Sequence, residues 1–282
     1  MRPHRVILRC FHWLAARATK RKVNFVIAGA MKCGTTALDA YLRQHPDIGM
    51  ADIKEVHFFD RDEYFRGRRP PYALYHSHFM HVRSRKLWGE ATPRYMFLQS
   101  APARLREYNP AMKMIVILRN PIERAYSHWN MGRTRFSDAT PFGEAIRRPQ
   151  EWGLVSEKEK WAGLTYVSRG FYATQLERVW ETFPKSQTLV LRSEALRSNP
   201  LPVLNEICRF LEIPPFAQVE NREAYAGQYA APMNRPDWEF LKQTFEPDIK
   251  KLEQLLGWDC RNWLRAPAGL AEPAGAMSVC PD

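Results

Sequence analysis

A short apolar run that leads into a glycine-bounded turn constrains this chain most. The buried strand would be Phe25-Val26-Ile27-Ala28, and the turn runs through residues 29–34 into a helix that begins at Thr35. Such a unit wraps a phosphate, because free N–H groups and the positive end of the helix dipole point at the anion. In the Walker A pattern a lysine directly follows the second glycine, whereas here Lys32 stands two residues before Gly34. We therefore expect a phosphate site of a different kind from an ordinary ATPase loop.

Strand-like and helix-like segments alternate along the rest of the chain. We expect strands at 23–28, 86–93, 112–118 and 188–191, and helices at 35–44, 98–108, from 121 onward, 166–183, 202–211 and 238–256. This order predicts an α/β fold, a single domain with a central parallel sheet flanked by helices in a P-loop-like architecture. The domain would span 23–263, with a basic segment at 1–22 and a disordered tail, rich in Ala, Gly and Pro, at 264–282. Residues 131–162 are expected to be irregular.

The charge balance is strongly basic. Lys and Arg number 42 against 30 Asp and Glu, a net charge of +12. This indicates either a solvated basic surface or a polyanionic partner such as a nucleotide, a sulfated glycan, nucleic acid or an anionic membrane. Residues 1–22 hold seven Lys/Arg and no acid. They could form an amphipathic helix on a membrane surface, or simply a surface helix or a frayed terminus.

The chain shows no convincing signal peptide or membrane span, and its five cysteines form no C-x-x-C pair. We therefore expect a reducing, cytoplasmic location, with contact at the cytoplasmic face of a membrane left open, and no metal site. Cys33, inside the phosphate loop, could be a nucleophile. No neighbouring base is evident, so a small loop-packing residue is the simpler interpretation.

A second anion site is expected at the end of the strand 112–118. This strand ends at Arg119, and Ser127 lies about two turns into the helix that follows. In open α/β sheets ligands bind at that edge, and a guanidinium with a hydroxyl suits a phosphate. A Walker B strand usually ends in Asp, so Arg119 argues against a magnesium-dependent kinase or NTPase. A nucleotide with phosphates at both ends of its ribose would use both sites.

The segment Lys54-Glu55-Val56-His57-Phe58-Phe59-Asp60 provides candidate acid–base groups. Read alone, it is an ordinary amphipathic segment with solvated charges. Because the phosphate loop lies upstream, Glu55 and His57 become candidates for proton transfer. We expect burial against Phe58 and Phe59 to raise the pKa of Glu55. The Arg-, His- and Tyr-rich stretch 61–85, expected to be partly helical, could line a cleft for an acceptor.

Several motifs in order support a family resemblance. They are G-A-M-K-C-G-T-T-A-L, H-P-D, K-E-V-H-F-F-D, G-E-A-T-P-R-Y and I-L-R-N-P-I-E-R-A-Y-S-H-W, followed by G-F-Y-A-T-Q-L-E-R-V-W, L-V-L-R-S-E-A-L, A-P-M and L-L-G-W-D. Over about residues 23–263 the chain resembles the sulfotransferases that use 3′-phosphoadenosine 5′-phosphosulfate (PAPS). It is most similar to the branch with the heparan sulfate N- and 3-O-sulfotransferases and their bacterial relatives.

The resemblance implies a role for each matching residue. Glu55 would be the base that deprotonates an acceptor hydroxyl or amine, and His57 would assist it or position the acceptor. Arg119 and Ser127 would bind the 3′-phosphate, and Lys32 would also neutralise charge on the leaving phosphate, without a metal. The product would be adenosine 3′,5′-bisphosphate. The loop residues implied to bind the 5′-phosphosulfate are Lys32, Cys33, Gly34, Thr35 and Thr36.

The chain also departs from that branch. Ala91 stands where those enzymes carry a Lys, with Arg94 the nearest cation, and 226–228 replaces a K-G-R cluster, for which Arg222 or Arg235 could substitute. The acceptor would be a saccharide, a glycolipid or a small hydroxylated molecule, and not nucleic acid. Two alternative functions are that of a P-loop nucleotide kinase or NTPase, and that of a basic nucleic-acid- or membrane-binding module without catalysis.

Overall fold

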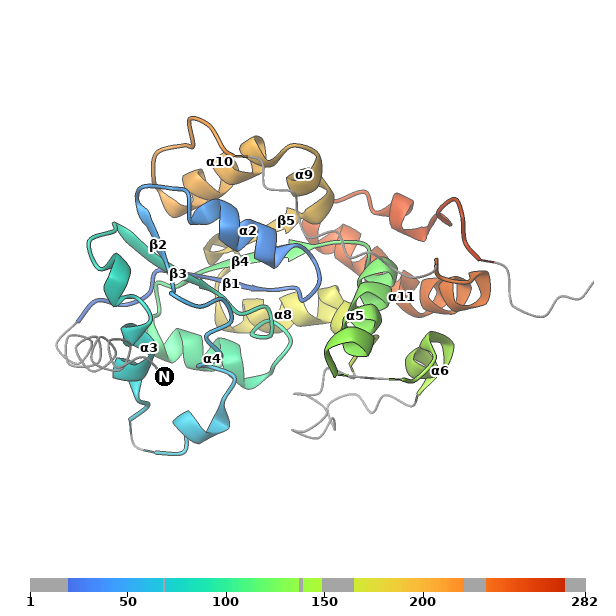
Figure 1. Cartoon of the computed structure of the whole chain (residues 1–282), viewed down its shortest axis with the longest axis horizontal. Coiled ribbons are helices and arrows are strands. Elements are labelled where there is room, and N and C mark those ends of the chain that lie inside the picture. The colour runs from blue at the N-terminus through green and yellow to red at the C-terminus, as the bar shows by residue number, and fades with distance from the viewer. Residues whose placement is uncertain (1–19, 68, 137–138, 149–164, 221–231, 272–282) are drawn as a thin grey trace, which may run out of the picture. The chain divides into compact units, whose positions relative to one another are not determined.

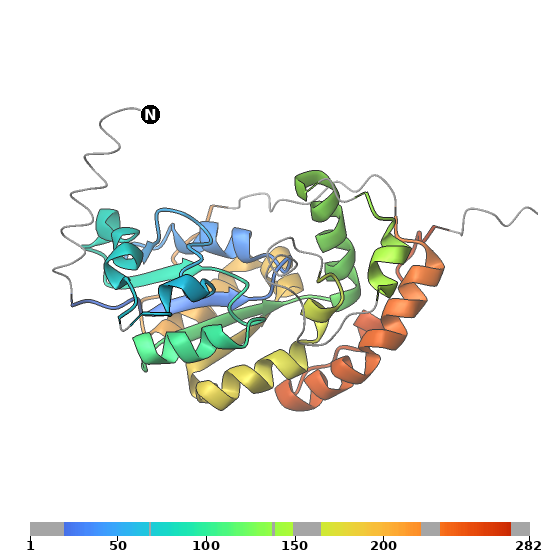
Figure 2. The same ribbon diagram turned by 90° about the horizontal axis from the view of Figure 1, so that it is seen from below.

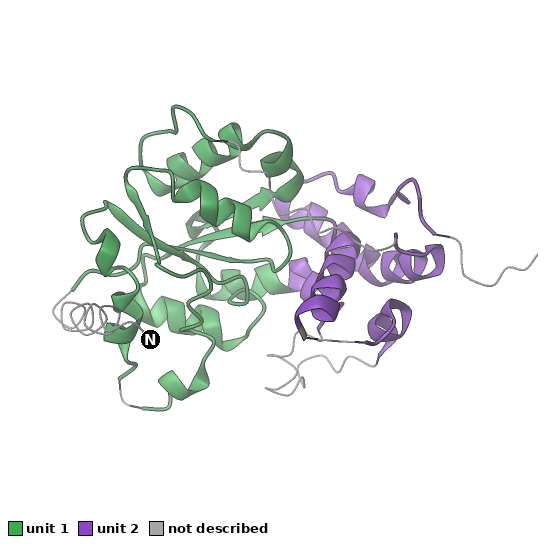
Figure 3. Cartoon of the chain, viewed as in Figure 1, with its two compact units in different colours: residues 1–119, 175–225 green, residues 120–174, 226–282 purple. Residues whose placement is uncertain are grey.

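A computed structural model describes residues 20–67, 69–136, 139–148, 165–220 and 232–271 of the chain. The chain divides into two compact units (Figure 3). The first comprises Met1–Arg119 with Gln175–Tyr225, and the second comprises Asn120–Thr174 with Ala226–Asp282.

The first unit is built on a five-stranded parallel sheet with the order β2-β3-β1-β4-β5 (Figure 1). Its central strands are almost wholly buried, as expected for a parallel sheet covered on both faces. The α/β fold with a parallel sheet is therefore confirmed. The strands are β1 Phe25–Gly29, β2 Ile48–Met50, β3 Leu87–Ala91, β4 Lys113–Leu118 and β5 Thr188–Arg192.

Helices cover both faces of this sheet. In Figures 1 and 2, α2 and α10 lie on one side of the strands and α4 on the other. Because all strands run parallel, their carboxyl ends and the loops that follow them share one edge of the sheet. The helical elements of this unit are α2 Thr35–Leu42, η1 Asp62–Tyr64, α3 Tyr72–Ser77, η2 Met80–Val82, α4 Ser100–Tyr108, η4 Lys185–Gln187, α9 Ser193–Ser198 and α10 Pro200–Leu211.

The second unit is helical in its described part. Its elements are α5 Pro121–Phe136, α6 Phe142–Arg147, η3 Ser168–Gly170, α11 Arg235–Leu256 and η5 Arg261–Leu264. The helix α6 corrects our expectation that residues 131–162 are irregular. Phe142, Ala145 and Ile146 follow helical spacing and are buried, and Phe142 packs edge-on against Tyr126 of α5 with ring centroids 4.9 Å apart.

The long helix expected at 166–183 is wrong at its first turns. The structure has the short η3 turn and then α8 at Tyr172–Thr182, a helix whose residues divide between the two units. The reason is a helix start that the local sequence does not show. A carboxylate oxygen of Asp248 accepts a hydrogen bond from the backbone N–H of Ala173 at 3.1 Å, which satisfies a donor in the first turn of α8.

Some predictions fall on residues outside the described ranges. These include most of the basic segment 1–22, and the whole of 226–228 with Arg222. In the predicted tail, 264–271 is described, and Ala271 pairs with Asn234, whereas 272–282 lies outside. Within the described ranges, none of the helices combines the length and apolar character needed to span a membrane.

Candidate active site

The phosphate loop joins β1 to α2 at the carboxyl edge of the sheet. Gly34 precedes α2 with φ +96°, a left-handed conformation that glycine adopts without steric cost. Lys32 also has positive φ, at +70°, and the backbone N–H of Ala30 donates to the carbonyl of Ile117 on β4. No described side chain caps α2. Gly34 and Thr36 are exposed while Thr35 is buried, so the turn presents backbone and a hydroxyl to solvent at the start of a helix.

Two residues of the loop are fixed by close packing. A Cβ on Gly29 would lie 2.7 Å from the sulfur of Met96, so only glycine fits here. The backbone N–H of Met96 donates to the carbonyl of Ala28, which ties the segment after β3 to the end of β1. Cys33 is fully buried. Its burial supports the interpretation as a packing residue, since a nucleophile needs access to substrate.

The expected 3′-phosphate residues lie at the end of β4 and in α5. Arg119 is half-buried, and its Nη1 donates to the carbonyl oxygen of Lys32 at 3.4 Å, which places the guanidinium beside the phosphate loop. Ser127 is buried in α5. Arg119 closes the first segment of one unit and Ser127 belongs to the other, so their joint role remains a prediction.

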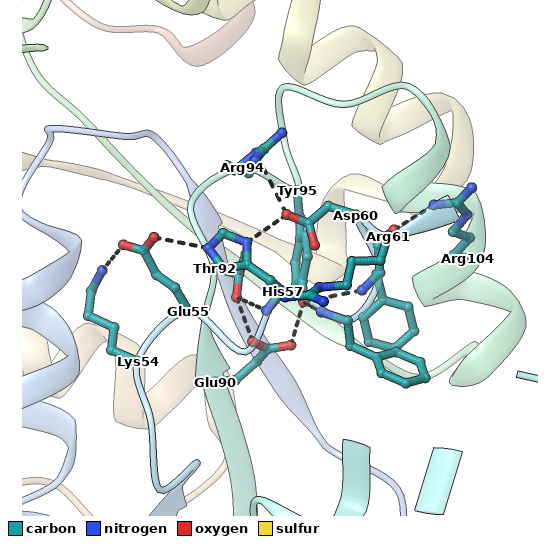
Figure 4. Close-up of polar contacts among 12 residues, drawn as sticks. Lys54, Glu55, His57, Asp60, Arg61, Glu90, Thr92, Arg94, Tyr95 and Arg104 are labelled. Carbon is teal, nitrogen blue, oxygen red and sulfur yellow. Dashed lines mark hydrogen bonds and ion pairs between the residues drawn. The ribbon is translucent and has the colours of Figure 1, made fainter. Parts of the chain in front are cut away.

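The candidate acid–base residues and two neighbours form a row of alternating charges (Figure 4). This acid–base row consists of Lys54, Glu55, His57 and Asp60. Nζ of Lys54 lies 2.5 Å from Oε1 of Glu55, and Oε2 of Glu55 lies 3.4 Å from Nε2 of His57. The other ring nitrogen of His57 lies 2.7 Å from Oδ2 of Asp60. Glu55 keeps about a third of its side chain exposed, at 32%, whereas the side chain of Asp60 is completely buried. The row therefore has one end open to solvent.

The pKa of Glu55 is lowered, which corrects our expectation. Burial raises the pKa of Glu55. The hydrogen bond from His57 and the charge and hydrogen bond of Lys54 outweigh the effect of burial, and they lower the pKa to about 2. Burial lowers the pKa of His57, but hydrogen bonds and negative charge from Asp60 and Glu55 raise it to about 9. At neutral pH this part of the site therefore holds a carboxylate beside an imidazolium.

The acid–base row lies outside helices and strands, and an unusual backbone conformation brings its side chains together. Glu55 and His57 both have positive φ, at +64° and +55°, which is uncommon for residues other than glycine. The backbone N–H of Glu55 donates to the carbonyl of Ala91, the last residue of β3. The row is thereby attached to the strand that neighbours β1, from which the phosphate loop emerges.

Sequence reasoning missed two members of this row and one neighbour. Asp60 follows His57 by three residues in the K-E-V-H-F-F-D segment, and Lys54 precedes Glu55, but neither was assigned a role. Arg94, noted only as the cation nearest Ala91, is buried with its Nε 3.6 Å from Oδ2 of Asp60. The spacing of Asp60 from His57 was the available signal.

Candidate metal ligands do not gather at this site. In the part of the chain that the structure describes, there is no group of three or more His, Cys, Asp or Glu side chains arranged to hold a metal ion. Lys32 lies in the phosphate loop, and the guanidinium of Arg119 lies beside it.

Comparison with known proteins identifies the family and the fold. The family model described as the sulfotransferase domain matches residues 22–228. A solved structure of a sulfotransferase from Alicyclobacillus acidocaldarius superposes with a TM-score of 0.70 at 29% identity, covering 87% of this chain and 100% of the other.

Curated relatives point in the same direction. Mouse (Mus musculus) heparan sulfate glucosamine 3-O-sulfotransferase 3B1 is 31% identical over 199 residues, which are 71% of this chain and 48% of that protein. Human (Homo sapiens) bifunctional heparan sulfate N-deacetylase/N-sulfotransferase 3 is 30% identical, with 90% of this chain and 32% of that protein covered. The chain thus spans half or less of the length of these relatives.

Proposed function

This chain belongs to the sulfotransferase family, and from that premise we propose that it moves the sulfuryl group of PAPS to a hydroxyl or amine of a saccharide of the heparan sulfate kind. The observation that carries the proposal is Glu55. It is a partly exposed carboxylate with a lowered pKa, and its backbone N–H is bound to the end of β3, next to the strand that opens into the phosphate loop. A donor at the loop and a proton acceptor beside it are the two parts that the reaction needs.

The step is an in-line displacement. The acceptor oxygen or nitrogen gives its proton to Glu55 as it forms a bond to sulfur, and the bond between sulfur and the bridging oxygen breaks. The electron pair of that bond passes to the 5′-phosphate of adenosine 3′,5′-bisphosphate. Lys32 and the N–H groups at the start of α2 would stabilise this charge, so we propose a step that needs no metal.

The base strength of Glu55 has to change during the cycle. A carboxylate with a pKa of about 2 accepts a proton weakly. Lys54 contributes to this low value, and its ammonium is a natural partner for the sulfate and carboxylate groups of an acidic saccharide. We propose that acceptor binding draws Lys54 from Glu55, and that Glu55 becomes a stronger base when the acceptor is present.

The exposed cations after the site suit an acidic acceptor. Arg66 and Arg69 are exposed on the loop between η1 and α3, which follows the acid–base row in the chain. Two relatives bear the names of enzymes that act on heparan sulfate, a polysaccharide rich in anionic groups. The acidic saccharide is therefore the acceptor class that we propose, ahead of a glycolipid or a small alcohol.

Transfer of ³⁵S from labelled PAPS tests the proposal. The acceptors are N-deacetylated heparosan with free amines, N-sulfated heparosan with hydroxyls only, a glycolipid and a small phenol, with EDTA present. Label in either polysaccharide supports the acceptor class. Label in N-sulfated heparosan shows O-sulfation, and label only in N-deacetylated heparosan shows N-sulfation. Label only in the phenol or the lipid contradicts it. The donor is tested separately: thermal stabilisation by ATP with Mg²⁺, and not by adenosine 3′,5′-bisphosphate, would contradict PAPS.

A further inference from the structure

A second glutamate, Glu90, lies beneath the acid–base row and has no part in the step above. It is on β3, is fully buried, and its partners among the described residues are three hydroxyl groups. Oε1 accepts from Tyr75 at 2.8 Å and from Tyr95 at 3.0 Å, and Oε2 accepts from Thr92 at 2.7 Å. A buried carboxyl without a cation beside it is costly, so its retention calls for an explanation.

Two of the three hydroxyls also hold the backbone of the acid–base row. The Tyr95 oxygen accepts from the N–H groups of Phe58 at 3.2 Å and Phe59 at 3.5 Å. The Thr92 oxygen accepts from the backbone N–H of His57 over a longer distance of 3.5 Å. Figure 4 shows Glu90 below both hydroxyls and the row above them.

The direction of these hydrogen bonds depends on Glu90. A hydroxyl has one hydrogen to donate and lone pairs with which to accept. When Glu90 is ionised, Thr92 and Tyr95 each donate that hydrogen to its carboxylate, and their lone pairs are left to accept N–H groups from the row. The row requires such support, because Glu55 and His57 both hold left-handed backbone conformations that relax unless the surroundings fix them.

We propose that Glu90 is a positioning residue, which acts through the hydroxyls of Thr92 and Tyr95 to fix the backbone on which Glu55 and His57 meet. The proposal rests on the proposed function in one respect, that Glu55 is the base. Glu90 itself touches no reacting atom. Its third partner, Tyr75, packs its ring against Phe58 and Phe59, while its hydroxyl donates to the same oxygen as Tyr95. Tyr75→Phe keeps that ring and removes only the hydroxyl, which makes it a matched control.

The experiment compares Glu90→Gln, Tyr95→Phe and the control Tyr75→Phe. The Gln side chain presents an NH₂ group where a carboxylate oxygen was, so one hydroxyl must reverse and one support of the row is lost. At pH 8, above the Glu90 pKa of about 7, we expect kcat for sulfation of N-sulfated heparosan to fall about 10- to 100-fold in Glu90→Gln and Tyr95→Phe, as misplacement of a reacting group does. The KM for PAPS should stay within about twofold in all variants, and Tyr75→Phe should keep its kcat.

A second readout needs no acceptor. NMR titration of the His57 ring in the wild-type protein should show the raised pKa, and Glu90→Gln and Tyr95→Phe should bring it toward the ordinary value, unlike Tyr75→Phe. Thr92→Val replaces Tyr95→Phe if the latter does not fold. An unchanged His57 pKa in Glu90→Gln and Tyr95→Phe, or an equal change in Tyr75→Phe, overturns the positioning role. If the titration behaves as expected while no acceptor takes label, the proposed function fails and the positioning role stands.

Discussion

Oδ2 of Asp60 lies 2.7 Å from Nδ1 of His57, and the Asp60 side chain is wholly buried while the histidine ring is partly exposed. A buried acceptor on one ring nitrogen fixes the ring plane and leaves Nε2 directed toward Glu55. The relationship also accounts for charge, because the two carboxylates on either side keep the imidazolium protonated. We therefore expect the protonated His57 to orient Glu55, and not to compete with Glu55 for the proton of the acceptor.

Replacement of Asp60 by Asn should change the titration of His57. The amide keeps one acceptor but loses the negative charge, so the pKa of His57 should fall from about 9 toward its ordinary value. NMR titration of the ring measures this shift. Asp52→Asn is the control, since Asp52 forms a comparable pair with His78 at 2.6 Å. A His57 titration that is the same in both variants would contradict the assignment of Asp60.

Replacement of Glu55 by Gln should remove the base while the shape of the site remains. We expect sulfation to fall about 10²- to 10⁴-fold, the usual contribution of a positioned general base. Binding of adenosine 3′,5′-bisphosphate, followed by calorimetry, should be unchanged, because Glu55 is proposed to act on the acceptor. The matched control is Glu63→Gln on the exposed η1 turn. Near-normal turnover of Glu55→Gln would exclude Glu55 as the base.

Elements that depend on interactions between residues near in sequence could be predicted, whereas elements that depend on distant partners could not. β1, the phosphate loop and β4 could be predicted because apolar runs and glycines act over a few residues. The buried three-residue strand β2 was not anticipated, because it is short and its partner β3 lies far along the chain. The start of α8 was misplaced for the same reason, since its hydrogen-bonding partner Asp248 is distant in sequence.

The sequence predicted which acid–base residues lie together, but it did not predict their pKa values. Glu55 and His57 were identified from residue type and resemblance. The pKa of Glu55 was predicted in the wrong direction, because positive φ at both residues brings Lys54 and His57 onto its carboxylate. Only burial by the neighbouring phenylalanines entered the prediction, although Lys54 is adjacent to Glu55 in the sequence. Backbone conformation of this kind leaves little signal in residue type, beyond glycine and a weaker preference for Asn, Asp and His.

Removal of the charge of Lys54 should make Glu55 a stronger base before any acceptor binds. In Lys54→Met the carboxylate loses a cation 2.5 Å away, so the pKa of Glu55 should rise. The acid limb of the pH profile of kcat/KM should therefore move to higher pH. An acceptor without anionic groups isolates this effect, because Lys54 cannot then be drawn away. Lys250→Met, which breaks an exposed ion pair with Glu246, is the control. A limb that moves to lower pH would contradict the proposed coupling.

Arg119 should determine preference for the 3′-phosphate of the donor. Arg119→Ala should weaken binding of adenosine 3′,5′-bisphosphate about 10- to 100-fold, the range expected for loss of a charge-assisted hydrogen bond. Binding of adenosine 5′-phosphosulfate, which has no 3′-phosphate, should change little. Arg197→Ala on the exposed part of α9 provides the control. Equal losses for the two nucleotides would assign Arg119 to the 5′ side or to the structure of the loop.

The protonation state of Glu90 should also affect the stability of the fold. Burial raises the pKa of Glu90, and although three hydroxyl hydrogen bonds oppose it, the pKa reaches about 7 in the folded protein. A carboxyl whose pKa is higher folded than unfolded contributes stability at low pH. It loses that contribution as the pH rises from the unfolded value through about 7, because only the unfolded chain ionises freely.

The wild-type protein should therefore lose stability relative to Glu90→Gln between pH 5 and pH 8. The change expected from the shift is on the order of 2–3 kcal/mol in the free energy of unfolding, since Gln does not titrate. Urea unfolding at several pH values measures the difference between the two proteins. Glu107→Gln, an exposed position on α4, should show no such trend. A difference between wild type and Glu90→Gln that is independent of pH would mean that Glu90 is ionised throughout, held by the three hydroxyls alone.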